Sequence, residues 1–244
     1  MNSLRIREAT SHQDLDEITR IQREVWKVED IDIAGRIQLR ASQQAGGSVL
    51  VAETEGGPMA GFAYAFPAYE RGEAFWHSDM LAVRPQFRGT QVGQALKWAQ
   101  RDRALMSGIT RIAWTFDPMQ AGNAHFNLTL LGATAREYLD NFYGVTTSAL
   151  HHGLPTDRLL ASWDLNRPAV VALSRGEVAP SPLTPSRVLI PPLWNELVNR
   201  DSGAARAEQR RVAGSLKAAF AQGLVAAGFE KRSSSYLLSP TEGP

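Results

Sequence analysis

Apolar residues along this chain follow two spacings, alternation in short runs and recurrence every three or four residues in longer ones. Alternation is typical of strands and the longer period of helices. In chain order the patterns predict a strand at residues 5–8, a helix at 14–25, strands at 48–53, 59–66 and 75–83, a helix at 90–106, a strand at 111–116, a short helix at 123–131, and strands at 133–138 and 158–165. This order predicts an α/β protein with a mixed sheet and helices on its faces.

The pattern changes near Arg167. The segment GEVAPSPLTPS, residues 176–186, is rich in proline and serine, as linkers are. We therefore expect one domain at 1–165, a linker or irregular arm at 166–186, and a C-terminal β-α-β extension at 187–244. In this extension we expect a strand at RVLIPP, a helix at 201–227 and a strand at FEKRSSSYLL. The pattern leaves open whether the extension completes an acceptor pocket, pairs with a second subunit in a homodimer, or only extends the sheet.

Composition narrows the class of function. The chain has 244 residues, 43% of them hydrophobic, which is enough for a substantial core. Its formal net charge of +1 argues against a nucleic-acid-binding protein, so the expected partners are small molecules or proteins. No apolar run approaches the roughly 18 residues of a membrane span, and the N-terminus lacks the apolar middle of a signal peptide. We expect a cytoplasmic protein without a membrane partner. The absence of cysteine excludes disulfides and an acyl-enzyme on a cysteine sulfur.

The stretch VRPQFRGTQVGQALKWAQ, residues 83–100, places glycines between an expected strand and an apolar helix. The first N–H groups of a helix have no partner within it, and the helix dipole makes them a site for anions. Gly89 permits close approach of a ligand, Thr90 is a candidate helix cap, and Arg84 and Arg88 add positive charge. The pattern favours a phosphate or pyrophosphate ligand; an ordinary capped surface helix is the alternative.

Two segments, LAVRPQFRGTQVG and TFDPMQAGNAHFNLTLLGA, resemble the GNAT N-acyltransferase superfamily over about residues 1–165. FDPMQAGNAHFN and GLPTDR are also similar to a bacterial subgroup that is mostly uncharacterised. The resemblance implies the GNAT fold, with acetyl-CoA or another acyl-CoA as co-substrate. The family writes the pyrophosphate-binding turn Q/R-x-x-G-x-G/A, and here the turn falls on Arg88, Gly89, Thr90, Gln91, Val92 and Gly93. Gln91 stands where the family usually has glycine.

The resemblance also implies a sheet that splays open between the strand ending at Val83 and the strand at 111–116. The pantetheine arm would bond to the backbone of Leu81, Ala82 and Val83, where an N–H group can polarise the thioester carbonyl. Asn123 and Asn127 are expected to bond the pantetheine amides, with helix capping and packing as the alternative.

The strand before this turn carries two titratable groups. Alternation predicts that His77, Asp79, Leu81 and Val83 share one face. The spacing in HSDMLAV is similar to arylalkylamine N-acetyltransferases, which implies His77 as the base and Asp79 as its orienting partner. The alternative is a partly buried histidine beside a structural acceptor.

Many family members protonate the CoA thiolate with a tyrosine, but its place here falls near Leu128. The remaining candidates are His125, Asn127, Tyr138, Tyr143 and water, of which His125 and Tyr143 enter the expected site. Arg158 is a candidate ligand for a substrate carboxylate, with a surface ion pair as the alternative. His151 and His152 lack the accompanying ligands of a metal site, so we expect no metal.

The resemblance implies an N-acyltransferase that passes an acetyl or related short acyl group, succinyl among them, directly to the amine of a small molecule such as an amino acid. The reaction would proceed through a tetrahedral intermediate. Two alternatives stay open, a non-catalytic acyl-CoA-binding sensor or interaction module and an acetyltransferase for a protein amine.

Overall fold

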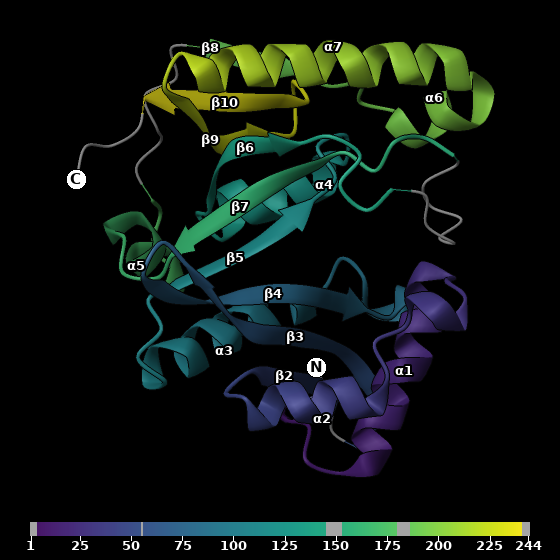
Figure 1. The fold of residues 1–244 in the computed structure, drawn as a ribbon, viewed down its shortest axis with the longest axis vertical. Helices are drawn as coiled ribbons and strands as arrows, with labels where there is room; N and C mark the ends of the chain where they lie inside the picture. The colour runs from purple at the N-terminus through teal and green to yellow at the C-terminus, as the bar shows by residue number, and fades with distance from the viewer. Residues whose placement is uncertain (1–3, 55, 145–152, 180–185, 241–244) are drawn as a thin grey trace. The chain divides into compact units, whose positions relative to one another are not determined.

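The computed structural model of the chain describes residues 4–54, 56–144, 153–179 and 186–240 (Figure 1). Backbone contacts divide the chain into two compact units. Among the described residues, the first unit comprises 4–113 and the second comprises 114–240. Within the described residues no helix combines the length and the apolar character needed to cross a bilayer.

The first unit is an antiparallel sheet with helices on both faces. Its elements are β1 (Leu4–Glu8), α1 (His12–Trp26), the 3-10 turn η1 (Asp30–Asp32), α2 (Arg36–Gln44), β2 (Ser48–Thr54), β3 (Met59–Glu70), β4 (Glu73–Val83), the 3-10 turn η2 (Pro85–Phe87), α3 (Val92–Met106) and the start of β5 (Arg111–Phe116). The strand order is β1-β2-β3-β4, each pair antiparallel, and β4 pairs in parallel with β5.

Each face of this sheet has its own apolar core. On one face, buried residues of α1 and α2, including Leu15, Ile18 and Leu39, pack against Phe62 and Tyr64 of β3. On the opposite face, Val92 and Leu96 of α3 pack against β2 and β3, with Leu81 and Val83 of β4 beside them. The N-terminal half of α3 and the end of β4 therefore contribute to the same apolar core.

The second unit contains the remaining strands and the C-terminal helices. Its elements after β5 are α4 (Ala121–Ala124), the π-helix η3 (His125–Leu130), β6 (Thr134–Leu139), β7 (Arg158–Asp164), α5 (Pro168–Ser174), β8 (Ser186–Leu189), α6 (Trp194–Arg200), α7 (Ser202–Ala221), β9 (Leu224–Glu230) and β10 (Ser235–Pro240). The strand order is β5-β7-β6-β9-β10-β8, and α7 runs along the C-terminal strands (Figure 1).

The α/β prediction is confirmed. Each predicted strand up to residue 165 begins and ends within four residues of an observed strand, and the observed β3 and β4 are longer than predicted. The helix α2 was not predicted, because only Leu39 is buried in its polar sequence. The expectation of an irregular arm at 166–186 was wrong for residues 168–174. These residues form α5, with a proline in its first turn where the missing N–H does no harm.

The extension also differs from the predicted β-α-β pattern. Asp201 is extended, ends α6 and caps α7 by accepting the Ala204 N–H at 2.9 Å. The helix predicted at 201–227 ends at Ala221, because Gly223 turns the chain with φ +78°. The predicted single strand FEKRSSSYLL is a hairpin of β9 and β10, with Ser234 at φ +48° in its turn. Ala135 of β6 pairs with Ala226 of β9, while the predicted domain boundaries stay a prediction.

Candidate functional site

The N-terminus of α3 presents four backbone N–H groups that donate to no acceptor within the described chain, those of Gly89, Gln91, Gly93 and Gln94. The neighbouring N–H groups are used locally, because Arg88 N bonds to Pro85 O at 3.2 Å and Thr90 N to Phe87 O at 3.4 Å. Gly89 has φ +76°, which favours glycine, and a Cβ there would meet only open space. We call these four groups the amide cradle. It has the chemistry of an anion site at a helix N-terminus.

Two details of this turn differ from expectation. Thr90 does not occupy the cap position; Gln91 does, without a side-chain cap bond. The Thr90 hydroxyl instead donates to Phe87 O at 2.5 Å, and Val92 N reaches it only at 3.4 Å. Gln91 has φ −82° and ψ 5°, a conformation open to any residue. The backbone therefore does not require the glycine that the family usually has here.

Arg84 was expected to add positive charge beside the anion site, but its guanidinium is held in contacts with other groups. Its guanidinium forms ion pairs with Glu17 at 2.5 Å and Glu24 at 2.9 Å, and it donates to Met59 O at 3.2 Å. Arg84 thus fixes the end of β4 to α1. Arg88 is exposed and is the arginine of this turn that keeps its charge in solvent.

Leu81, Ala82 and Val83, which the resemblance assigns to the pantetheine arm, lie at the end of β4 beyond its pairing with β5. The pairing between β4 and β5 comprises Trp76 with Ile112 and His77 with Ala113. Beyond His77, β4 runs on to Val83 paired with β3. In the described residues, this stretch of β4 has a strand partner on one side, which leaves its other edge for a ligand.

The predicted common face of His77, Asp79, Leu81 and Val83 was wrong. Tyr64 of β3 pairs with Met80, but Phe66 pairs with His77, so two residues, Ser78 and Asp79, stand opposite one residue of β3. This bulge reverses the alternation. His77 stacks on Phe66 with ring centroids 5.1 Å apart, on the face that carries Met80. Leu81 and Val83 face α3 instead.

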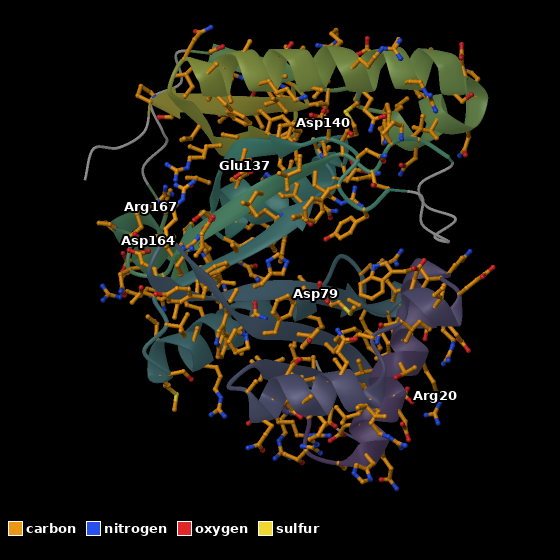
Figure 2. The ribbon with its side chains drawn as sticks, viewed as in Figure 1. Arg20, Asp79, Glu137, Asp140, Asp164 and Arg167 are labelled. Carbon is orange, nitrogen blue, oxygen red and sulfur yellow. The ribbon has the colours of Figure 1, made fainter. Side chains whose placement is uncertain are left out.

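Burial shifts the pKa of both titratable groups at the bulge. Desolvation, and secondly the charge of Lys97, lower the pKa of His77, which favours neutral imidazole. Desolvation raises the pKa of Asp79, although Asp79 is exposed. Figure 2 labels this side chain on β4. No hydrogen bond joins His77 to Asp79 among the described residues. The direct bond expected between an orienting carboxylate and its base is therefore not formed.

Sequence reasoning missed a buried polar cluster beside the bulge. The Lys97 ammonium of α3 donates to Ser78 Oγ at 3.0 Å and to Gln100 Oε1 at 2.7 Å, and Ser78 Oγ donates to Gln100 Oε1 at 2.9 Å. Desolvation holds the pKa of Lys97 well below its usual range. The signal was available in part, since Val92, Leu96 and Gln100 recur every four residues and place a polar residue on a core stripe.

The second unit brings together two of the predicted residues, Tyr143 and Arg158. The Arg158 guanidinium lies 5.0 Å from the centroid of the Tyr143 ring, and the Tyr143 hydroxyl lies 2.8 Å from Thr115 Oγ1. Arg158 also donates to the backbone oxygen of Asp157 at 2.8 Å. Tyr143 is 46% exposed even with these contacts, so a ligand can reach it.

The other candidates of the second unit are engaged to different degrees. The ring nitrogen Nδ1 of His125 bonds to Phe229 O at 3.1 Å. Tyr138 donates to Asp157 at 2.7 Å, and burial raises the pKa of Tyr138 far above its usual range, which makes it a poor acid. Asn123 is exposed, whereas Asn127 is buried and its side chain has no hydrogen-bond partner in the described residues. His151 and His152 lie outside the described residues.

Comparisons with known proteins bear on the family and the fold. Residues 12–128 match the sequence model of the Acetyltransferase (GNAT) family. A search of curated proteins finds no match.

Among solved structures, a putative acetyltransferase of Salmonella typhimurium with acetyl-CoA is 20% identical, with TM-score 0.52 over 68% of this chain and 95% of that one. The ribosomal-protein-S18-alanine N-acetyltransferase of Escherichia coli is 16% identical, with TM-score 0.52 over 66% and 93%. This chain spans only 14% of a fungal multi-domain β-N-acetylglucosaminidase that has a glucosamine N-acetyltransferase region; that match is 20% identical, covers 47% of this chain and has TM-score 0.40.

The two likenesses with TM-score 0.52 show the fold. The residues matched by the family model contain α1 to η3 up to residue 128, with the amide cradle and the bulge of β4. Over this part, the resemblance to the GNAT superfamily is supported by the family model, and the solved structures show the same fold.

Proposed function

We propose that the protein is an acyl-CoA-dependent N-acyltransferase that passes an acetyl or related short acyl group, succinyl included, to the amine of a small molecule such as an amino acid. The observation that carries the proposal is the amide cradle at the start of α3. It occurs together with β4, which has a bulge and, beyond His77, a strand partner on one side only in the described residues. The cradle supplies donors for a diphosphate, and the free edge of β4 supplies backbone groups for an extended amide-bearing arm.

In the proposed reaction the amine nitrogen attacks the thioester carbonyl carbon. A C–N bond forms, the C–S bond breaks, and coenzyme A leaves as its thiolate. His77 takes the proton from the amine, directly or through water, because its lowered pKa keeps it neutral near pH 7. A bulge leaves one backbone N–H outside the strand ladder, and such a group can stabilise the developing oxyanion.

The acceptor class follows from the strength of this base. Deprotonating a lysine-like amine at neutral pH costs about 4 to 5 kcal/mol, whereas an α-amine with a pKa near 8 costs about 1 kcal/mol. A histidine without a bonded carboxylate suits the second task better. Arg158 beside Tyr143 offers a cationic group for the carboxylate of such an acceptor, and Tyr143 and His125 remain the candidates for protonating the thiolate.

A thiol-release screen tests this function directly. Purified protein is offered acetyl-CoA or succinyl-CoA with a panel of amino acids, and free coenzyme A is followed with a thiol reagent. We expect release that depends on the amine, and we expect His77→Ala with Asp79→Ala to suppress it while coenzyme A still binds, since the cradle is untouched.

The same screen separates the alternatives. Tight binding of coenzyme A without thiol release for any amine would contradict catalysis and favour a sensor or interaction module. Release with peptides but not with free amino acids would move the acceptor to a protein amine, the class named for the Escherichia coli relative.

A further inference from the structure

The cluster of Lys97, Ser78 and Gln100 connects the two parts of the first unit that the proposed reaction uses. Ser78 is the first of the two residues that make the bulge of β4. Lys97 and Gln100 lie on α3, the helix whose N-terminus forms the amide cradle. All three side chains are buried, at 2%, 5% and 0% exposure respectively for Lys97, Ser78 and Gln100.

Burying these polar side chains in a protein core costs free energy. Gln100 continues the buried stripe of Val92 and Leu96, and Lys97 is buried on the same helix. The Gln100 Nε2 group is buried and has no hydrogen-bond partner among the residues that the structure describes, so its donors are unsatisfied there. Apolar residues of similar volume often stabilise a protein when they replace such a buried polar group. We therefore expect that the cluster serves to position a neighbouring element and does not serve to stabilise the fold.

The bulge is the element that the cluster holds. An extra residue in a strand weakens the local ladder, so the bulge depends on its side chains for a defined position. Ser78 Oγ receives one bond from Lys97 and gives one to Gln100, which fixes it to α3 on two sides. Since α3 is rigid, the position of the bulge relative to the amide cradle is then also fixed.

We propose that Lys97 is a positioning residue that, with Gln100, pins Ser78 and so sets the distance between the coenzyme-binding amides of α3 and the reacting groups on the bulge of β4. This role rests on the proposed function, because it assigns the two ends to one reaction. Because Lys97 is buried, we assign its effect to Ser78, to which it donates, and not to contact with a substrate.

The test is Lys97→Met, which keeps the length of the side chain and removes its hydrogen bonds and charge. We expect coenzyme A affinity by calorimetry to stay within about twofold and the melting temperature to be unchanged or higher. We expect kcat for thiol release to fall about 10- to 100-fold, the effect of a misplaced reacting group. Arg103→Met is the matched control, since Arg103 is a half-exposed cation of the same helix, paired with Glu8. It should leave kcat within twofold.

Hydrogen exchange supplies a readout that does not need activity. In Lys97→Met the amides of residues 78–80 should exchange faster, while those of β2 keep their rates. A kcat within twofold of the parent, or unchanged exchange at the bulge, would overturn the proposal. If the parent protein releases no thiol at all, the proposed function fails, and the exchange result still decides whether Lys97 holds the bulge.

Ser78→Ala covers the case in which Lys97→Met does not fold. It removes the hydroxyl and leaves the direct contact between Lys97 and Gln100 at 2.7 Å. We expect the same pattern, retained coenzyme A affinity with reduced kcat and faster exchange at the bulge. Full activity with parental exchange rates in Ser78→Ala would also contradict the proposal.

Discussion

Gly89 and Gly108 form a natural pair for separating binding from stability. Their φ angles are +76° and +74°, and a Cβ at either position would meet open space. Alanine is strained by roughly 1 to 2 kcal/mol in this region, so Gly89→Ala and Gly108→Ala should lose similar stability by chemical denaturation.

Only Gly89→Ala should weaken coenzyme A binding, by about tenfold or more, because its methyl group stands beside the amide cradle. Calorimetric titration of both variants with coenzyme A measures this difference. Equal affinities in the two variants would place the diphosphate elsewhere.

His77 gives the site a predictable response to pH. Its pKa is lowered by burial and by Lys97, so it lies below the ordinary value of 6.5. As a base it works when neutral, and kcat/KM should therefore fall on the acid side with a midpoint below pH 6.5. Between the folded and the unfolded pKa the unfolded chain binds more protons, so the contribution of His77 to stability rises with pH in that window.

The titration is measured by NMR on histidine-labelled protein, with His77→Gln to assign the resonance. In Lys97→Met, the charge that opposes protonation is absent, and the pKa of His77 should move upward. A midpoint above 6.5 in the parent protein would contradict the stated environment of this residue.

At the residue scale, the sequence indicated which residues form the turn and the strand before it, but not the faces on which the side chains of that strand lie. The residues of the cradle and of the strand before it were predicted from the glycines and the resemblance. The faces of His77 and Leu81 were not, because strict alternation has no place for an inserted residue, and a bulge leaves no clear mark in HSDMLAV. Lys97 was missed because a charged residue in an amphipathic helix is normally solvated.

At the scale of elements, the bounds of helices and strands were predicted well where the apolar period was strong. They were predicted poorly where a turn or a cap residue ends the element. β5 was predicted with its observed bounds, Arg111–Phe116, because four of its six residues are buried in an apolar run. The π-helix η3 was expected only as a short helix, since its hydrogen bonding leaves no separate period. The break between α6 and α7 depends on one residue, Asp201, which is extended and caps the second helix.

A substitution at Gly132 tests how closely the turn after η3 packs against α5. It has φ +73°, and a Cβ there would lie 2.9 Å from Leu173 and 3.3 Å from Val170, both on α5. The Gly132 carbonyl also accepts from Arg167 at 2.8 Å. Gly132→Ala should therefore lose more stability than Gly108→Ala, which shares the backbone strain without the close contacts.

The expected excess is about 1 to 3 kcal/mol, typical of overpacking, measured by urea denaturation of both variants. A loss equal to that of Gly108→Ala would mean that α5 shifts freely to admit the methyl group.

At the scale of the whole molecule, the C-terminal extension contributes side chains to the core of the second unit. The Tyr236 hydroxyl donates to Pro118 O at 2.7 Å, and the Thr129 hydroxyl donates to Phe229 O at 3.0 Å. Phe229 and Tyr236 are almost fully buried and stack edge to face. Strand β9 pairs with β6, so removing it opens the edge of the sheet.

A chain ending at residue 186 should therefore not fold as the full chain does. It loses the buried side chains of β9, β10 and α7, each large one worth about 1.5 to 3 kcal/mol, against a total stability of about 5 to 15 kcal/mol. We expect an aggregating product, or one that binds ANS and melts without a cooperative transition. The measurement is calorimetry and ANS fluorescence beside the full chain. A truncated protein with the melting temperature of the full chain would instead make residues 1–165 an independent domain, as the sequence predicted. In that case the bonds of Tyr236 and Phe229 would hold only the extension in place and contribute nothing to the fold beneath it.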